Sequence, residues 1–234
     1  MKVSVALAAY NGEKYIEEQL ASILKQLRSD DEVIVSDDNP GGETERIVRT
    51  MAASDSRIHY LEGPGKGVIK NFEYAVSKTT GDIIFLSDQD DVWMPDKVRA
   101  ITREIKDGAV LVLHNASVTD ENLAVTEKSF FEKHGSKKGY LSNVMKNSYM
   151  GCCMAFDSCL KEEILPVPDG LPMHDQYIGL IAEKYAKRNG RRVVFLNTPY
   201  IYYRQHGDNV TGGKTKLSDK IRWRCSIIVK TLFK

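Results

Sequence analysis

Two patterns of apolar residues alternate along the first hundred positions of the chain. Short continuous apolar runs predict buried strands at residues 3–8, 32–36, 58–61 and 82–86. Between them, apolar residues at helical spacing predict helices at 15–26, 43–53 and 69–77. Strands that are separated by helices favour right-handed crossovers and a mainly parallel sheet. The pattern therefore predicts an α/β protein with a Rossmann-like α/β/α sandwich.

The second half of the chain is less regular. Its apolar spacing predicts a helix at 97–106, a strand at 109–114, a helix at 175–189 and a strand at 193–196. The polar residues 115–148 are expected to cross the surface, and the aromatic, basic segment 200–213 is expected to be a loop. No internal repeat interrupts this order, so we expect one domain with two unlike halves.

Composition and charge exclude several classes of protein. The formal net charge of +1 argues against a general nucleic-acid binder, which would carry a strong basic excess. The four cysteines form neither a CxxC nor a zinc-ligand spacing, and the adjacent pair Cys152-Cys153 is typical of reduced, packed thiols. A cytosolic protein is therefore expected. The N-terminus enters a strand directly, without the apolar region of a signal peptide, and no apolar run is long enough to cross a bilayer.

The strand at 82–86 is followed at once by three carboxylates, Asp88, Asp90 and Asp91. Unpaired charge is costly in an apolar interior, so the strand must end here, and its acidic tip must meet solvent or a cation. An Asp-x-Asp pair suits a hard divalent ion that takes its other ligands from water and a phosphate. The alternative is an acidic turn that caps the next helix, and we assign that capping role to Asp91.

Polar groups also follow the first two strands, and neighbouring parallel strands would bring all three tips to one edge of the sheet. Ligands bind at this edge in α/β proteins. The small Ala8 leaves room for a planar ring that Tyr10 could flank, and Asp38 could accept a hydrogen bond from a base N–H. Asp90 would then hold a metal ion against a diphosphate. The ordered set predicts a nucleotide site.

These motifs resemble family 2 glycosyltransferases of the GT-A fold. The resemblance rests on residues 3–5, 9–12 and 35–38 and on Gly81-Asp82-Ile83-Ile84-Phe85-Leu86-Ser87-Asp88-Gln89-Asp90-Asp91-Val92-Trp93-Met94-Pro95. Residues 151–156, 174–177 and 203–209 are similar to the rhamnosyltransferase-like branch. The resemblance implies a GT-A domain over 1–213, with a nucleotide-binding half at 1–106, an acceptor-binding half at 107–213 and a basic amphipathic tail at 214–234.

Residue roles follow from the motifs that match. Tyr10 and Asp38 match positions that bind the nucleotide base. Asp88 matches the first Asp of the DXD motif, near ribose and metal, and Asp90 matches the second, the main ligand of Mn²⁺ or Mg²⁺. Asp175 matches the general base of inverting members. On spacing alone, Asp175 would instead be read as the cap of an apolar-periodic helix.

Four further residues are weaker candidates. His206 could ligate the metal or, with Arg204, contact the diphosphate; the alternative is a loop histidine that is bonded to main chain. Lys70, beside a glycine-rich loop, could reach phosphate or ribose, or be solvated. Trp93 could stack on a sugar or pack where the strand meets the next helix.

The tail is the last candidate site. Its apolar stripe, flanked by basic residues, could lie on an anionic membrane surface or pack on the domain. The stripe consists of Leu217, Ile221, Cys225, Ile228 and Leu232.

The expected function is a metal-dependent transfer of a sugar, rhamnose or another hexose, from a dTDP- or UDP-sugar to a glycan or lipid-linked acceptor. Bacterial surface polysaccharide synthesis at the inner face of the plasma membrane would suit it. One alternative is a nucleotidyltransferase, but residues 8–12 lack the basic phosphate loop that it would need. The other is a non-catalytic glycan-binding module, against which the intact set of Asp88, Asp90 and Asp175 argues.

Overall fold

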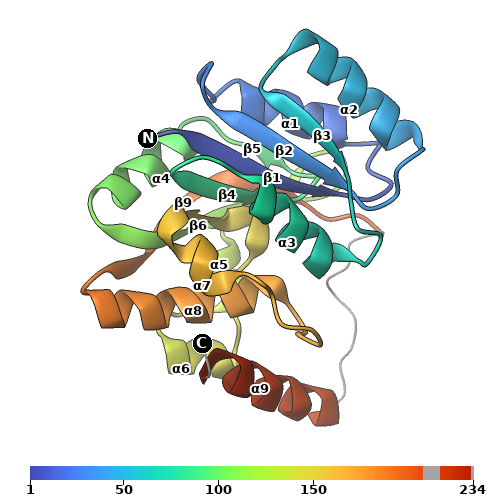
Figure 1. Cartoon of the computed structure of the whole chain (residues 1–234). Helices are drawn as coiled ribbons and strands as arrows, with labels where there is room; N and C mark the ends of the chain where they lie inside the picture. Colours follow the sequence, from blue (N-terminus) through green and yellow to red (C-terminus); the bar gives the residue numbers. More distant parts are fainter. Residues whose placement is uncertain (208–216, 233–234) are drawn as a thin grey trace.

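A mixed sheet forms the centre of the computed structural model, which describes residues 1–207 and 217–232 (Figure 1). Its strand order is β3-β2-β1-β4-β8-β6-β9-β5, and β7 pairs with β6. The strands are β1 (Val3–Ala9), β2 (Glu32–Asp37), β3 (Ile58–Glu62), β4 (Ile83–Ser87), β5 (Val92–Trp93), β6 (Ala109–Thr119), β7 (Val125–Glu127), β8 (Met154–Asp157) and β9 (Arg192–Arg204).

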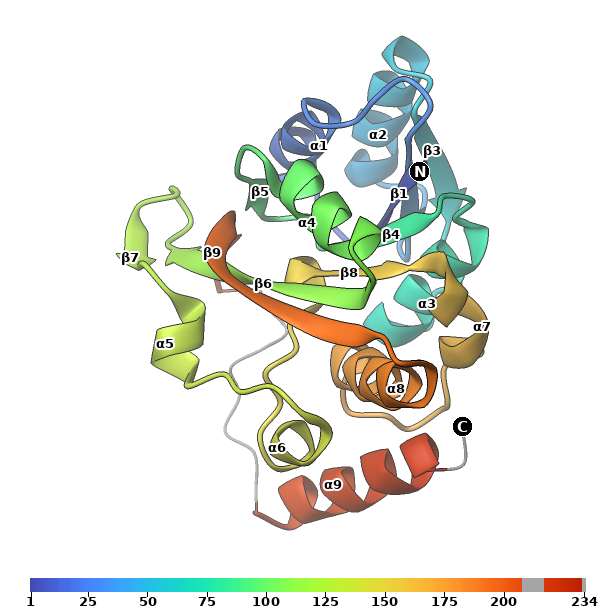
Figure 2. The ribbon, with the colours of Figure 1, turned by 90° about the vertical axis from the view of Figure 1, so that its left-hand side faces the viewer.

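Helices cover both faces of this sheet. Figure 2 shows α1, α2 and α4 on one side and α3, α7 and α8 on the other, with α6 and α9 outside α8. The helices are α1 (Ile16–Leu24), α2 (Glu43–Ser54), α3 (Val68–Lys78), α4 (Lys97–Lys106), α5 (Phe130–His134), α6 (Tyr140–Met145), α7 (Lys161–Ile164), α8 (His174–Asn189) and α9 (Leu217–Leu232). Two 3₁₀ turns span Gly151–Cys153 and Ser158–Leu160. The predicted α/β/α sandwich is confirmed.

The four strands of the first half are parallel and end at one edge. Ala9 of β1 pairs with Asp37 of β2, and Leu7 of β1 pairs with Ser87 of β4. β1, β2 and β4 are buried along their whole length, which explains why they are continuous apolar runs in the sequence. Every predicted element of this half is present, with ends that differ by one or two residues.

The prediction of a loop at 200–213 is wrong for its first five residues, because Tyr200 to Arg204 belong to β9. These aromatic and β-branched residues favour a strand. Pro199 concealed the continuity, since proline rarely lies within a paired strand. Here it lies where the β6–β9 pairing shifts register. Residues 208–213 lie outside the described residues. The strand predicted at 109–114 likewise continues, to Thr119, so 115–119 are buried strand rather than surface crossing.

The C-terminal helix α9 packs on the domain. Ile227 and Thr231 are buried, and the hydroxyl groups of Tyr140 on α6 and Thr231 lie 2.7 Å apart. The stripe expected from the sequence is offset from this buried face, because Cys225 and Leu232 are exposed. The side chains of residues 217–221 are outside the described set. Among the described helices, none has the length and apolar content that crossing a membrane requires.

Candidate active site

Hydrogen bonds from β9 fix the acidic loop after β4. The main-chain N–H of Arg204 donates to Asp91 Oδ1 at 3.0 Å, and the guanidinium donates to the main-chain oxygens of Asp90 at 2.8 Å and Glu121 at 2.7 Å. The same guanidinium pairs with Glu18 on α1. Arg204 is buried, so it anchors the loop, whereas the sequence suggested a phosphate contact. Asp91 does not cap α4, because its partner is β9 and the N-cap position belongs to Asp96.

His206 lies directly beside Asp90. Its Nε2 is 2.8 Å from Asp90 Oδ2, and both side chains are largely buried. The ring of Tyr15 packs against His206, with centroids 5.0 Å apart, and against the Arg204 guanidinium at 4.5 Å. The structure therefore brings together two of the three predicted metal ligands, Asp90 and His206.

The third predicted ligand, Asp88, faces a different set of groups. Ligand atoms of Asp88, Asp91 and Cys152 lie within 4.8 Å of one another. Burial, followed by the charges of Asp90 and Asp175, raises the pKa of Asp88 to about 7. Buried Asp91 Oδ2 has no hydrogen-bond partner among the described residues. Carboxylates crowded in this way repel one another, and carboxylate oxygens suit Mg²⁺ or Mn²⁺, so Asp88 with the neighbouring Asp90 fits a divalent cation. The hydrogen bond to Cys153 and burial raise the pKa of the Cys152 thiol, so it does not serve as an oxygen-type ligand for such an ion.

A buried lysine lies under the acidic loop. Lys97, on the inward side of α4, donates to the main-chain oxygen of Cys152 at 2.8 Å. Its ammonium group lies 4.0 Å from the centroid of the Trp93 ring. Burial lowers the pKa of Lys97 to about 8, while the nearby thiols and carboxylates oppose that shift. Lys97 is not among the residues that the sequence motifs point to, although a lysine on the apolar face of a helix is itself a signal.

Tyr10 and Asp38 lie at the same sheet edge. Gln89 joins the first and fourth strand tips, since its side chain accepts from Tyr10 N–H at 2.8 Å and donates to Tyr10 C=O at 2.9 Å. The Tyr10 ring is 60% exposed and therefore available for stacking. Asp38 accepts hydrogen bonds from the N–H groups of Gly65 at 2.7 Å and Gly67 at 2.6 Å. Each oxygen of that carboxylate retains a further lone pair.

Two other candidates have structural partners. Lys70 forms ion pairs with Glu73 and Asp169 and donates to the main-chain oxygen of Val167 at 2.9 Å. Trp93 is buried against Phe85 as well as Lys97, in agreement with the alternative that it packs where the strand meets the next helix.

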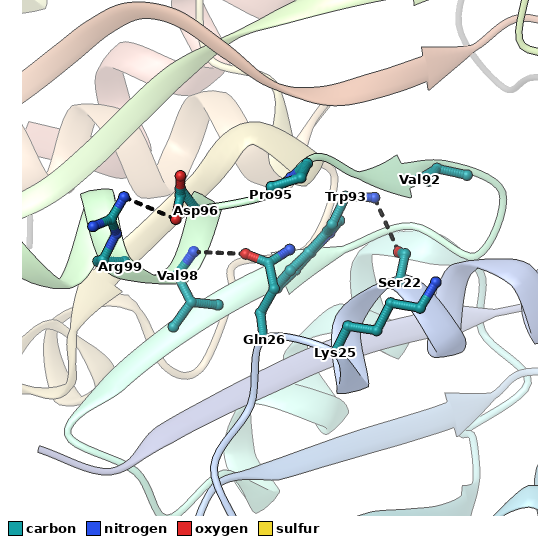
Figure 3. Close-up of a pocket in the computed structure, with 9 residues that line it drawn as sticks. All are labelled: Ser22, Lys25, Gln26, Val92, Trp93, Pro95, Asp96, Val98 and Arg99. Atoms are coloured by element: carbon teal, nitrogen blue, oxygen red, sulfur yellow. Dashed lines mark hydrogen bonds and ion pairs between the residues drawn. The ribbon is translucent and has the colours of Figure 1, made fainter.

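Trp93 also contributes to a hollow of about 500 Å³ between the end of α1 and the start of α4 (Figure 3). Of the predicted site residues, only Trp93 lines it, so this hollow is distinct from the sheet edge described above.

Asp175 approaches the acidic loop from α8. Asp175 is the second residue of that helix, and its carboxylate accepts a hydrogen bond from Gln176 N–H at 2.6 Å. The N-cap position belongs to Met173, so the capping alternative does not hold. Burial raises the pKa of Asp175 to about 7, and its charge contributes to the raised pKa of Asp88. A carboxyl group with a pKa near neutrality, facing a metal-type cluster, is suited to accept a proton.

Comparisons with solved structures identify the fold. The chain is similar to Staphylococcus aureus TarS 1–349 in complex with UDP-GlcNAc, with a TM-score of 0.74, 21% identity, and coverage of 98% of this chain and 66% of that one. It is also similar to the mannosyltransferase PcManGT of Pyrobaculum calidifontis in complex with GDP-Man and Mn²⁺, with a TM-score of 0.62, 20% identity, and coverage of 99% and 63%. The expected GT-A fold is confirmed.

Curated relatives agree with this fold. An uncharacterized glycosyltransferase of Nostoc is 23% identical over 89% of this chain and 66% of its own length. The dTDP-rhamnosyl transferase RfbG of Shigella flexneri is 27% identical over 92% of this chain and 77% of its own. A β-1,3-glucosyltransferase of Campylobacter jejuni, named for an undecaprenol-linked substrate, is 23% identical over 92% and 69%. This chain thus spans about two thirds of the length of several of the proteins that it matches.

The model of the family described as "Glycosyl transferase family 2" matches residues 4–162, which contain all three polar strand tips and the acidic loop. This match covers more than half of the chain. The protein therefore belongs to glycosyl transferase family 2.

Proposed function

We propose that the protein transfers a sugar from a dTDP- or UDP-sugar to a hydroxyl group of a glycan or lipid-linked acceptor in bacterial surface polysaccharide synthesis. One observation carries the proposal: Asp175 on α8 and Asp88 at the tip of β4 are close enough for their charges to interact. This proximity supports placing the proposed proton acceptor near the proposed donor-binding edge. The names of the Shigella and Campylobacter relatives support rhamnose or glucose as the sugar, and the Campylobacter name supports a lipid-linked acceptor.

The donor would lie along the carboxyl ends of β1, β2 and β4. Its base would stack on Tyr10 and donate to Asp38, with the small side chain of Ala8 leaving room beneath it. Asp88 and Asp90, with His206, would hold Mn²⁺ or Mg²⁺, which when bound neutralises charge on the leaving diphosphate. Arg204 fixes the main chain of this loop, and Lys70 fixes the turn at 167–169.

Asp175 would accept the acceptor's proton. As the acceptor oxygen bonds to the anomeric carbon, the bond from that carbon to the diphosphate oxygen breaks, and its electron pair leaves with the nucleoside diphosphate. Attack from the face opposite the leaving group inverts the anomeric configuration. A pKa of about 7 leaves a useful fraction of Asp175 deprotonated at neutral pH while retaining affinity for the proton.

Thermal unfolding with UDP, dTDP or GDP, each with and without Mn²⁺, tests donor binding. At least one nucleotide should raise the Tm, and more so with Mn²⁺, because a ligand of the folded state stabilises it. Donor turnover then tests the base: Asp175→Asn should retain that Tm shift and lose about 10²–10⁴-fold in kcat. The matched control, Asp107→Asn, changes an exposed carboxylate at the end of α4. No shift with any nucleotide, or full turnover by Asp175→Asn, would refute the proposal.

A further inference from the structure

Exposed apolar side chains gather on two neighbouring helices. Half of the large apolar residues that are exposed in the described part of the chain lie on α6 or α9. Leu141 is 78% exposed and Met145 61%, one helical turn apart on α6. Val229 and Leu232 are 53% and 60% exposed, on the outward side of α9. We call this surface the α6/α9 face.

The two helices form one surface. Besides the contact between Tyr140 and Thr231, Arg224 on α9 donates to the main-chain oxygen of Met145 on α6 at 2.7 Å. Figures 1 and 2 both show α6 and α9 next to each other at one end of the molecule. Ile227 anchors α9 in the core, so the exposed residues belong to a packed helix.

Basic residues predominate on the two helices of the α6/α9 face, although Glu183 on α8 accepts from Gly139 N–H at the start of α6 and Lys133 pairs with Glu127 on β7. Residues 133–156, which include α6, contain lysines and neither Asp nor Glu, and residues 222–232 of α9 contain only basic charges. The whole chain has a formal net charge of only +1. The basic residues are Lys133, Lys137, Lys138 and Lys146 in the first segment and Arg222, Arg224 and Lys230 in the second.

We propose that the α6/α9 face docks on the surface of a lipid bilayer that contains anionic lipids. Apolar side chains entering the headgroup boundary and basic side chains attracted to anionic headgroups are the two contributions that hold a helix in this position. An acidic polysaccharide would use the basic residues only and would leave the apolar ones without a role. A bilayer therefore accounts for both observations.

Docking would orient the active site. Lys230 donates to the main-chain oxygen of Asp169, and Ser226 on α9 donates to Gly170 at 3.4 Å. This turn directly precedes α8, whose first turn carries Asp175. The surface would thus lie beside the acceptor half of the protein, as a lipid-linked acceptor requires. The docking itself does not depend on the proposed glycosyl transfer.

Flotation with vesicles tests the docking without any substrate, so its failure is distinct from failure of the proposed transfer. The protein should float with vesicles of phosphatidylcholine plus phosphatidylglycerol, and less with phosphatidylcholine alone. The double variant Leu141→Ser/Leu232→Ser should lower the bound fraction at least tenfold, and so should Lys146→Glu/Arg222→Glu. Val125→Ser, an exposed apolar residue on β7, is the matched control and should bind normally. Circular dichroism melting confirms that each variant is folded.

Three results would overturn the proposal. The first is no flotation with the anionic vesicles. The second is equal loss in Val125→Ser, which would show a general effect of surface apolarity. The third is binding that the charge variant abolishes and the apolar variant leaves intact, which would indicate a polyanion site.

Discussion

Replacing Glu32 with glutamine should destabilise the fold without touching the active site. Glu32 starts β2, at the end of the sheet opposite the candidate site, and is almost fully buried. Its carboxylate accepts from Ser4 Oγ at 2.5 Å, from Lys2 Nζ at 2.9 Å and from Thr80 N–H at 2.7 Å. These bonds join β1, β2 and the turn before β4. An amide would present a donor to groups that are themselves donors.

The pKa of Glu32 gives the size of the effect. Burial alone would raise it, but the bonds from Ser4, Lys2 and Thr80 outweigh burial and lower it from 4.5 to about 2. At about 1.4 kcal/mol per pKa unit this corresponds to about 3 kcal/mol, and solvent screening reduces the expected loss to about 2 kcal/mol at pH 7. Because the folded pKa is the lower one, the contribution is complete above pH 4.5 and disappears as the pH falls towards 2.

Urea unfolding of wild type and Glu32→Gln at pH 7, 4 and 3 measures the contribution of Glu32 to the free energy of unfolding. The free-energy difference should persist at pH 4 and fall below half of its pH 7 value at pH 3. Glu43→Gln, which removes an exposed pair with Arg46, is the control and should leave stability unchanged. A difference that is absent at pH 7, or independent of pH, would refute the reasoning.

Three more substitutions test the packing around the site. Gly12→Ala places a Cβ 2.1 Å from Gln89 Oε1, so the Gln89 amide must move away from Tyr10. Calorimetry should show nucleotide affinity reduced about fivefold, which corresponds to about 1 kcal/mol for a lost hydrogen bond. Gly179→Ala places a Cβ 2.3 Å from the buried Tyr149 ring and should cost about 1–3 kcal/mol in urea unfolding. Arg204→Met removes the bonds to the main-chain oxygens of Asp90 and Glu121 and the pair with the half-exposed Glu18, and should cost about 1–3 kcal/mol, with weaker Mn²⁺ binding in titrations.

The first half of the fold was predictable because its information is local. β1, β2 and β4 are buried and mostly apolar, β3 is partly buried, and each helix carries its own apolar stripe, so the order follows from the pattern. The second half depends on contacts between distant segments. The segment Tyr200 to Arg204 is a strand because β6 and β5 flank it, and no window around Pro199 contains those partners.

The sequence indicated where the candidate site residues lie in the fold, but it did not indicate which groups they contact. Tyr10, Asp38 and Asp88 follow strands that the sequence already placed side by side. Asp91 was assigned to the following helix, yet its partner is the N–H of Arg204, far away in the chain. The buried face of the C-terminal helix was misjudged because apolar residues lie on more than one side of it, and only the contacts with α6 and α8 select the inward side.

The two amide bonds to Asp38 have a thermodynamic consequence. The glycines that donate them have positive φ angles, +64° at Gly65 and +84° at Gly67, which other residues rarely adopt. With both oxygens held, the Asp38 side chain keeps one rotamer before any nucleotide arrives. Ordering a side chain on binding costs about 0.5–1.5 kcal/mol of free energy. The Asp38 side chain is already ordered in the folded protein, so binding would not require that ordering. If Asp38 binds the base as proposed, loosening the glycine loop would therefore weaken nucleotide binding through entropy, without removing the proposed contact to the base.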